Sequence, residues 1–275
     1  MGGPTAGKQP CISSTFVDTQ TERDAIQREI IPNVRGIAAR LGISINCVDM
    51  RFGIPRDSTS ASTIHTCLQT VSHCFSQGPG PAFVFLSTDK YGWVPRIPTW
   101  IPCKAMRAGK ATRQLYAKDN SYVDERAVLR EEQNDKELVE TCRQELMAFA
   151  KKNEADAPGL LSVLNLSMTA LQVQLGMRLS AYCNSPIGQC CVIERQFGNP
   201  DNIKNTMEGL SKTLFVSDAT RAWDVKYEKE VRDLRQYVCR GNVNIVSSPI
   251  IDSASSFKEF QKNGIRTFLQ DWIST

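Results

Sequence analysis

Hydrophobic positions along this chain alternate between strand-like runs and helix-like stripes. A short first strand is expected to end near Ile12, and four longer apolar runs follow it: ISINCVD, PAFVFLS, CCVIER and VNIVS. Between the runs, apolar residues recur every three or four positions, as they do on one face of a helix. Such alternation predicts a mostly parallel sheet with helices on both faces.

The helix after the first strand has the clearest stripe. Its apolar residues are Ile26, Ile30, Val34, Ile37 and Leu41. Pro32 interrupts the stripe, and a proline inside a helix removes one backbone hydrogen bond, so we expect a kink or a restart there. Gly42 is expected to end the helix, because glycine readily adopts the left-handed conformation found just after a helix.

Four further helices are predicted. They are a helix that begins near Ser62 or Thr63, a helix from Ser167 to Leu179, a helix around Trp223 to Val238 that ends at Gly241, and a closing helix from Ser255 to Trp272. With the five strands, they predict a flavodoxin-like or TIR-like three-layer α/β sandwich with a five-stranded sheet. Ligands of such folds bind in the crevice at the carboxyl ends of the strands.

The alternation is interrupted at about residues 96–160. Six basic residues and no acidic one lie from Arg96 to Lys118, and an acid-rich stretch follows. This segment is predicted to be an insertion with one charged helix, roughly Val128 to Lys152. The predicted organisation is a flexible tail at 1–9 and a single α/β domain at 10–275 that carries the insertion.

Composition narrows the class of protein further. The chain has 275 residues, 41% of them hydrophobic and 23% charged, with a formal net charge of +4. This charge is mild, so composition argues against a nucleic-acid partner. No apolar run is long enough to span a bilayer, and the N-terminal residues lack an apolar signal core, so we expect a cytoplasmic protein. The ten cysteines are then expected to be reduced thiols, mostly in the core.

Candidate chemistry begins in ISSTFVDTQTERD, at the end of the first strand. Ser13, Ser14 and Thr15 are predicted to face the crevice. For the two serines, a ligand site and a structural hydrogen-bonding role both stay open. Asp18 or Thr21 is expected to cap the following helix, with the acid three residues after Thr21 completing a capping-box pattern.

Metal binding finds little support in the sequence. His65 and His73 are the only histidines, and both fall on the polar face of their predicted helix without a carboxylate or cysteine partner. No CxxC pair is present. We therefore expect no metal and no resident cofactor.

Several segments together resemble the amino-terminal, TIR-like domain of NACHT and WD-repeat proteins and of the telomerase-associated vault protein. They are ISSTFVDTQTERD, VDMRFGI, CLQTVSHC, GPAFVFLSTDKYGW, LSMTALQVQLG and CCVIERQF, in the family's order. In relatives this domain precedes a NACHT ATPase and WD repeats, and neither follows here. The resemblance implies the front module alone, or a fragment of a longer protein.

The resemblance also implies a role for the helix at Ser167 to Leu179. Enzymatically active TIR domains carry a glutamate in the corresponding helix and cleave NAD, where a carboxylate stabilises positive charge on the ribose. The family pattern reads Ser-x-x-Glu-x-Glu, but this chain has Ala170 and Gln172 at the two acidic places. Loss of such a charge typically costs a few kcal/mol, roughly 100-fold in rate.

Two hypotheses follow. The favoured one is a non-catalytic signalling or assembly module that binds protein partners or associates with itself. Its predicted interaction loop contains Arg51, Phe52, Ile54 and Arg56. The alternative is a TIR-like NAD-cleaving or nucleotide-binding enzyme. Its predicted crevice would contain Ser13, Ser14, Thr15, Asp18, Asp49 and Arg51.

Overall fold

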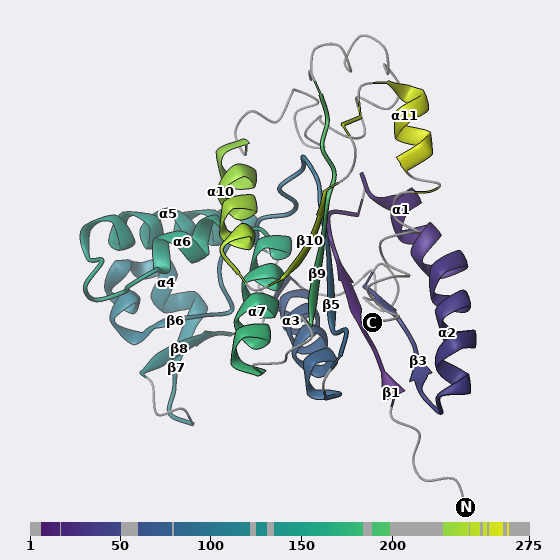
Figure 1. The fold of residues 1–275 in the computed structure, drawn as a ribbon. Helices are drawn as coiled ribbons and strands as arrows, with labels where there is room; N and C mark the ends of the chain where they lie inside the picture. Colours follow the sequence, from purple (N-terminus) through teal and green to yellow (C-terminus); the bar gives the residue numbers. More distant parts are fainter. Residues whose placement is uncertain are drawn as a thin grey trace, which may run out of the picture. The chain divides into compact units, whose positions relative to one another are not determined.

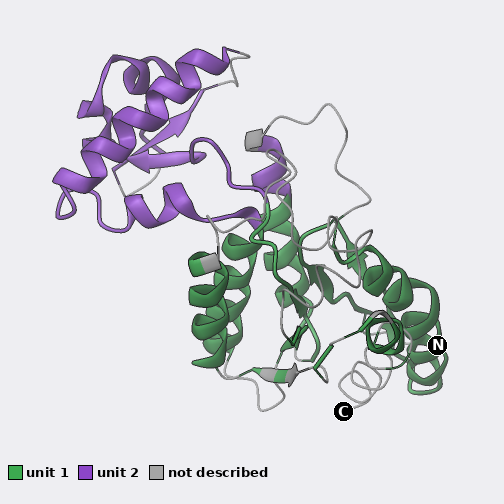
Figure 2. Cartoon of the chain, turned by 90° about the horizontal axis from the view of Figure 1, so that it is seen from above, with its two compact units in different colours: residues 1–53, 67–92, 169–275 green, residues 54–66, 93–168 purple. Residues whose placement is uncertain are grey.

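A computed structural model gives the structure of the chain. It describes residues 7–16, 18–50, 60–78, 80–121, 125–130, 135–183, 189–198, 228–241, 243–247, 250–251, 253–260 and 263. The chain divides into two compact units (Figure 2). Unit 1 comprises Met1–Gly53, Cys67–Gly92 and Thr169–Thr275, and unit 2 comprises Ile54–Thr66 and Trp93–Met168.

Unit 1 is built on a parallel sheet that has five strands within the described residues (Figure 1). The strands are β2 (Cys11–Ser13), β4 (Val48–Asp49), β5 (Phe83–Ser87), β9 (Cys190–Glu194) and β10 (Asn244–Ser247). Their spatial order is β10-β9-β5-β2-β4. In chain order this is 2-1-3-4-5, a common order of doubly wound α/β sheets. The order reverses between β2 and β5, and a ligand crevice in such sheets lies at this switch point.

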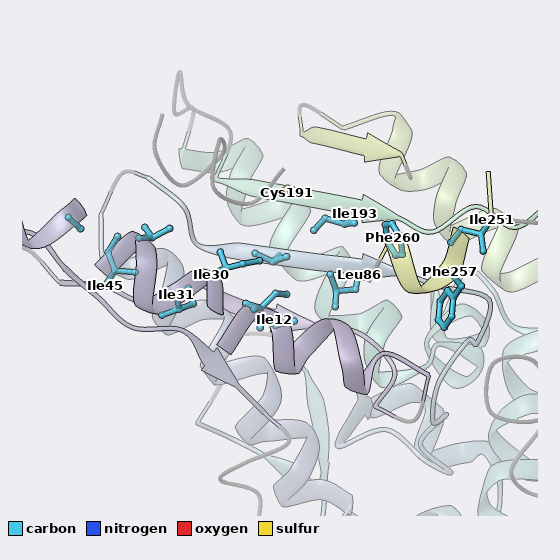
Figure 3. Close-up of a cluster of buried hydrophobic side chains, with 14 residues drawn as sticks. Ile12, Ile30, Ile31, Ile45, Leu86, Cys191, Ile193, Ile251, Phe257 and Phe260 are labelled. Carbon is cyan, nitrogen blue, oxygen red and sulfur yellow. The ribbon is translucent and has the colours of Figure 1, made fainter. Parts of the chain in front are cut away.

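Neighbouring residues of each strand contribute to two different cores, because side chains alternate between the faces of a sheet. Ile12, Val84, Leu86, Cys191 and Ile193 belong to one cluster with the helices that follow β2 (Figure 3). The residues between them pack on the opposite face with α3 (Ser60–Ser76), α7 (Met168–Cys183) and α10 (Glu228–Cys239). Helices thus cover both faces of the sheet, and the predicted α/β class is confirmed.

The helix after β2 is divided at the predicted proline. It runs as α1 (Gln20–Ala25), a π-helical turn (Ile26–Ile30) and α2 (Ile31–Arg40). Pro32 lies in the first turn of α2, directly after the π-helical turn, and its missing N–H interrupts the regular helical hydrogen bonding there. The predicted restart is therefore confirmed. Gly42 has φ of 71° and follows the helix as expected.

The second predicted strand is wrong as a single element. Its residues form β3 (Ser44–Ile45) and β4 (Val48–Asp49), which belong to different sheets. β3 pairs in parallel with β1 (Gly7–Lys8), so two residues of the segment predicted to be a tail lie in a strand. The Lys8 ammonium also donates a hydrogen bond to the carbonyl of Gln77 at 3.1 Å. Residues 1–6 lie outside the described part.

Unit 2 contains the whole of the predicted insertion, which has more structure than the one predicted helix. Its helices are η2 (Cys103–Ala108), α4 (Lys110–Leu115), α5 (Lys136–Lys152) and α6 (Leu160–Asn165). An antiparallel sheet combines β6 (Trp100–Pro102), β8 (Arg126–Leu129) and β7 (Tyr116–Asp119). The predicted start of the charged helix at Val128 is wrong, since Val128 pairs with Trp100 in this sheet.

The remaining helices are confirmed in part. α7 covers the predicted Ser167–Leu179 helix, and α10 ends before Gly241 as expected. The closing helix is described as α11 (Ala254–Glu259), and the start of the helix predicted from Trp223 lies outside the described residues. No described helix is long and apolar enough to span a membrane.

Candidate functional site

The predicted crevice residues near the carboxyl end of β2 fall into three groups of contacting side chains, here called neighbourhoods. The first contains Ser13, which is fully buried and donates its hydroxyl to Gln172 Oε1 at 2.8 Å. Gln172 Nε2 in turn lies 3.4 Å from the sulfur of Met50. Ala170 on the same helix is also fully buried. The expected acidic position beside Ser13 is therefore taken by a neutral amide from α7.

The second neighbourhood surrounds Arg23 of α1, whose side chain is completely buried. Its Nη1 lies 2.5 Å from Asp49 Oδ1 at the end of β4. Its Nε donates to Ser14 Oγ at 2.8 Å, and its Nη2 donates to the Ser14 carbonyl at 3.2 Å. Every nitrogen of the guanidinium thus has an acceptor. The group also lies 5.0 Å from the centroid of the Phe16 ring.

The third neighbourhood surrounds Arg195, which directly follows β9. Its Nη1 donates to the Asp18 carbonyl and to Glu22 Oε1, both at 2.8 Å, and its Nη2 pairs with Asp18 Oδ2 at 3.2 Å. The cation also stacks on two aromatic rings, with 5.1 Å to Phe197 and 5.7 Å to Phe257. One guanidinium therefore holds two buried carboxylates of the segment after β2.

This third neighbourhood leaves polar atoms unpaired. Within the described residues, Glu22 Oε2, Arg195 Nε and Asp89 Oδ2 are buried without a hydrogen-bond partner. Burial raises the pKa of Glu22, and Arg195 lowers it only in part. Burial likewise raises the pKa of Asp89, against Arg195 and Arg235. Low-dielectric surroundings disfavour the ionised form of both acids.

A small pocket lies at the switch point of the sheet. Its lining residues are Thr15, Phe85, Leu86, Ser87, Thr88, Lys90, Thr169, Val231 and Leu234. Thr15 connects the pocket to the Arg195 cluster, because its hydroxyl hydrogen-bonds to Asp18 and lies 3.2 Å from that of Thr88. The backbone of Gly92 packs closely against two of the lining residues, because a Cβ there would lie 3.0 Å from both Thr15 and Thr169.

Arg235 of α10 ties the strand ends near this pocket together. Its Nη2 lies 3.3 Å from Asp89 Oδ1, and its Nε lies 3.5 Å from Glu194 Oε1. The same Nε donates to Ser87 Oγ at 3.3 Å. Arg235 thus links the ends of β5 and β9 to α10.

The structure brings five of the predicted crevice residues to one edge of the sheet. Ser13, Ser14, Thr15, Asp18 and Asp49 are all buried there. Arg51 lies outside the described residues, as do Phe52, Ile54 and Arg56 of the predicted interaction loop. The predicted caps are wrong: Thr19 is the N-cap residue and makes no side-chain capping bond. Asp18 instead pairs with Arg195, and Thr21 lies inside α1.

Sequence reasoning missed Arg23, Arg195 and Glu22 as members of this site. One signal was available for Arg195, because an arginine directly after a buried strand lies at the carboxyl edge of the sheet. For Arg23 and Glu22, the polar stretch around α1 gives no sign of burial. Their burial depends on Asp49 and Arg195, which are distant in sequence.

The histidines and the adjacent cysteines Cys190 and Cys191 show no sign of a metal or catalytic role in the described residues. His65 and His73 are exposed on α3, as predicted. Burial raises the pKa of Cys190 and Cys191 to about 12, so both thiols are protonated at neutral pH. No group of three or more potential metal-binding side chains occurs among the described residues.

Comparisons with known proteins add a family resemblance for about a third of the chain. A segment of 92 residues is 38% identical to NACHT domain- and WD repeat-containing protein 1 of Mus musculus, and it covers 33% of this chain and 6% of that protein. Parts of this chain resemble NACHT and WD-repeat proteins. The resemblance predicted from the sequence is therefore confirmed.

Two further relatives have the same range of similarity. A segment of 83 residues is 31% identical to a TPR repeat-containing protein of Dictyostelium discoideum, and it covers 30% of this chain and 5% of that protein. A segment of 85 residues is 32% identical to Telomerase protein component 1 of Rattus norvegicus, and it covers 30% of this chain and 3% of that protein. The matched segments thus span only a few per cent of each relative. No family model and no solved structure matches.

Proposed function

We propose that the chain is a TIR-like, non-catalytic assembly module of the kind found in NACHT and WD-repeat proteins, and that it acts by binding protein partners or further copies of itself. The 2-1-3-4-5 strand order, which is that of flavodoxin-like folds, supports the TIR-like assignment. The names of the relatives, which contain repeat and NACHT modules, support membership of a larger assembly protein.

The single observation that carries the non-catalytic part is the pairing of Ser13 with Gln172. A neutral amide that accepts a hydroxyl hydrogen bond at 2.8 Å cannot stabilise a developing ribose cation. Nearby carboxylates do not replace the missing charge, because Asp49 is bound to Arg23 and Asp18 is bound to Arg195. Asp49 and Asp18 thus each pair with an arginine, and Glu22 shares the second arginine with Asp18.

The first test measures NAD cleavage. The purified chain is incubated with NAD, and free nicotinamide is followed by liquid chromatography. We expect no release above that of a heat-denatured sample. Steady release that is abolished by Asp49→Ala would contradict the proposal and support the enzyme, since Asp49 lies at the end of β4 in the predicted crevice.

The second test measures assembly. We expect light scattering to show a mass above that of the monomer, which falls toward the monomer in Phe52→Ala, because apolar residues at the centre of an interface contribute most of its binding energy. Tyr182→Ala is the matched control: Tyr182 is an aromatic residue with 88% of its surface exposed, outside the predicted loop. A strict monomer at all concentrations, with no partner, would count against the assembly role.

The pocket at the switch point favours a second candidate, a nucleotide-binding module without catalysis. Thr15, Ser87, Thr88 and Lys90 are among the residues that line it. Isothermal titration with ADP or NAD tests this candidate. Saturable binding that Lys90→Ala weakens would support it, and the absence of heat with either nucleotide would leave the assembly role alone.

A further inference from the structure

Helix α2 presents two large apolar side chains to solvent. Ile37 is 51% exposed and Leu41, the residue that ends the helix, is 73% exposed. Residues four apart lie on the same side of a helix, so the two side chains form a short apolar ridge. Figure 1 shows α2 beside β3. The buried residues of α2, which are Ile31, Val34 and Ala38, belong to the same cluster as residues of the unit 1 sheet. A pair of exposed residues of this kind needs a structural cause.

The cause is the π-helical turn at Ile26–Ile30. In an uninterrupted α-helix, Ile37 and Leu41 would continue the stripe of Ile26 and Ile30. The amide of Ile31 instead bonds to the carbonyl of Ile26, five residues back, so the turn contains one extra residue. One residue rotates everything that follows by about 100°. The buried stripe accordingly continues through Ile31, Val34 and Ala38.

The charged residues of α2 and of the segment that follows it have one sign. No acidic residue occurs from Ile30 to Val48, and the two charged residues in this stretch are Arg35 and Arg40. Both are exposed, and Arg40 lies one turn from Ile37 on the ridge side of the helix. Arg35 is held elsewhere, because its guanidinium donates to the Ile45 carbonyl and to Asn46 Oδ1, each at 3.0 Å.

We propose that Ile37, Arg40 and Leu41, here named the α2 face, bind an amphipathic helix of a partner protein that carries apolar and acidic residues. The apolar ridge matches the i, i+3, i+4 anchors of such a helix, and Arg40 matches a carboxylate. A second copy of the chain fits less well, because two α2 faces would bring arginines together. A lipid surface also fits less well, because the face lacks the aromatic and extended apolar area of interfacial helices.

This inference rests on the proposed assembly role, and it names one surface and the chemistry of its partner. The test uses a fluorescein-labelled helical peptide of about 14 residues, or four turns, with leucines on one face and glutamates on the other. Binding to the full chain is followed by fluorescence anisotropy. We expect saturable binding that Leu41→Glu and Arg40→Glu each weaken about 10-fold, equal to about 1.4 kcal/mol. Added salt should weaken it further.

The matched control is Ala39→Glu, an exposed position of the same helix on the side away from Ile37 and Leu41. It introduces the same charge and should change the affinity less than the α2-face variants do. A peptide with lysines in place of the glutamates should bind more weakly than the acidic one. Circular dichroism of each variant must show the wild-type helical signal.

Three results would overturn the inference. They are equal affinity for the acidic and basic peptides, binding to phosphatidylserine vesicles in place of the peptide, and a concentration-dependent dimer that Leu41→Glu dissolves. The last result would assign the α2 face to a second copy. The proposed function is tested separately, since nicotinamide release would refute it without changing peptide binding. Failure of the peptide to bind would leave the Phe52→Ala effect on assembly intact.

Discussion

The two buried arginine clusters at the sheet edge differ in how fully their charges and hydrogen-bonding groups are paired. Within the part of the chain that the structure describes, Arg23 pairs with one buried carboxylate, Asp49, and all three of its guanidinium nitrogens donate hydrogen bonds. Arg195 faces two buried carboxylates, from Asp18 and Glu22, and its Nε has no partner within the described residues. The first cluster is balanced in charge and in hydrogen bonds, and the second is not.

This difference separates a structural role from a possible functional one. The Arg23–Asp49 pair fixes the end of β4 to α1, and we expect it to stay ionised over a wide range of pH. An unbalanced cluster stores free energy, because burial disfavours the ionised form of Glu22 and raises its pKa. Acids whose pKa is shifted by burial and by a specific charged neighbour are enriched at functional sites.

The largest expected effect comes from breaking the balanced pair. Arg23→Met removes the cation and leaves Asp49 buried without it, so the free energy of unfolding should fall by about 3–5 kcal/mol. The measurement is urea unfolding followed by circular dichroism. The double variant Arg23→Met/Asp49→Leu should recover most of the loss, since it removes both charges. A single variant as stable as the wild type would mean that the pair contributes little.

A smaller loss is expected when a further buried carboxylate is added without an arginine partner. Gln172→Glu places an acid 2.8 Å from the Ser13 hydroxyl, beside the sulfur of Met50. Burial of an uncompensated charge is unfavourable, so the unfolding free energy at pH 7 should fall by about 1–3 kcal/mol. Protonation of the new acid should reverse much of this loss near pH 4. A loss that is the same at both pH values would point to altered packing instead.

The fold was largely predictable because the local pattern of apolar and polar residues indicated most of its strands and helices. The continuous apolar runs at Phe83–Ser87 and Cys190–Glu194 became central strands, as buried parallel strands should. The register of α2 was not predictable, since it depends on a π turn that leaves the apolar spacing of the sequence unchanged. The short strands of unit 2 were also missed, because β6, β7 and β8 span only three or four residues each.

The candidate site was predictable in place but not in chemistry. Hydroxyls at the end of β2 indicated the sheet edge, and Ser13, Ser14 and Thr15 lie there. Two of the partners there come from far along the chain: Ser13 bonds to Gln172, 159 positions away, and Asp18 pairs with Arg195, 177 positions away. Sequence spacing holds no information on such contacts, so Asp18 was assigned to a helix cap when it serves as a counter-ion for Arg195.

The smallest expected effect tests the unbalanced cluster directly. Glu22→Gln keeps an acceptor for Arg195 and removes a charge whose ionisation burial opposes. Because the folded pKa of Glu22 is raised, the folded state binds its proton more tightly than the unfolded state. Its contribution to stability is complete below the ordinary value of 4.5 and is lost as pH rises through the folded pKa. The glutamine variant lacks this loss.

Glu22→Gln should therefore be more stable than the wild type at neutral pH, and equally stable below pH 4.5. Urea unfolding between pH 4 and pH 8 measures the difference. Asp49→Asn is the comparison, because it removes the carboxylate of the balanced pair and should lower stability at neutral pH. If both variants change stability in the same direction, the two arginine clusters do not differ in charge balance, and Glu22 is simply a structural ligand of Arg195.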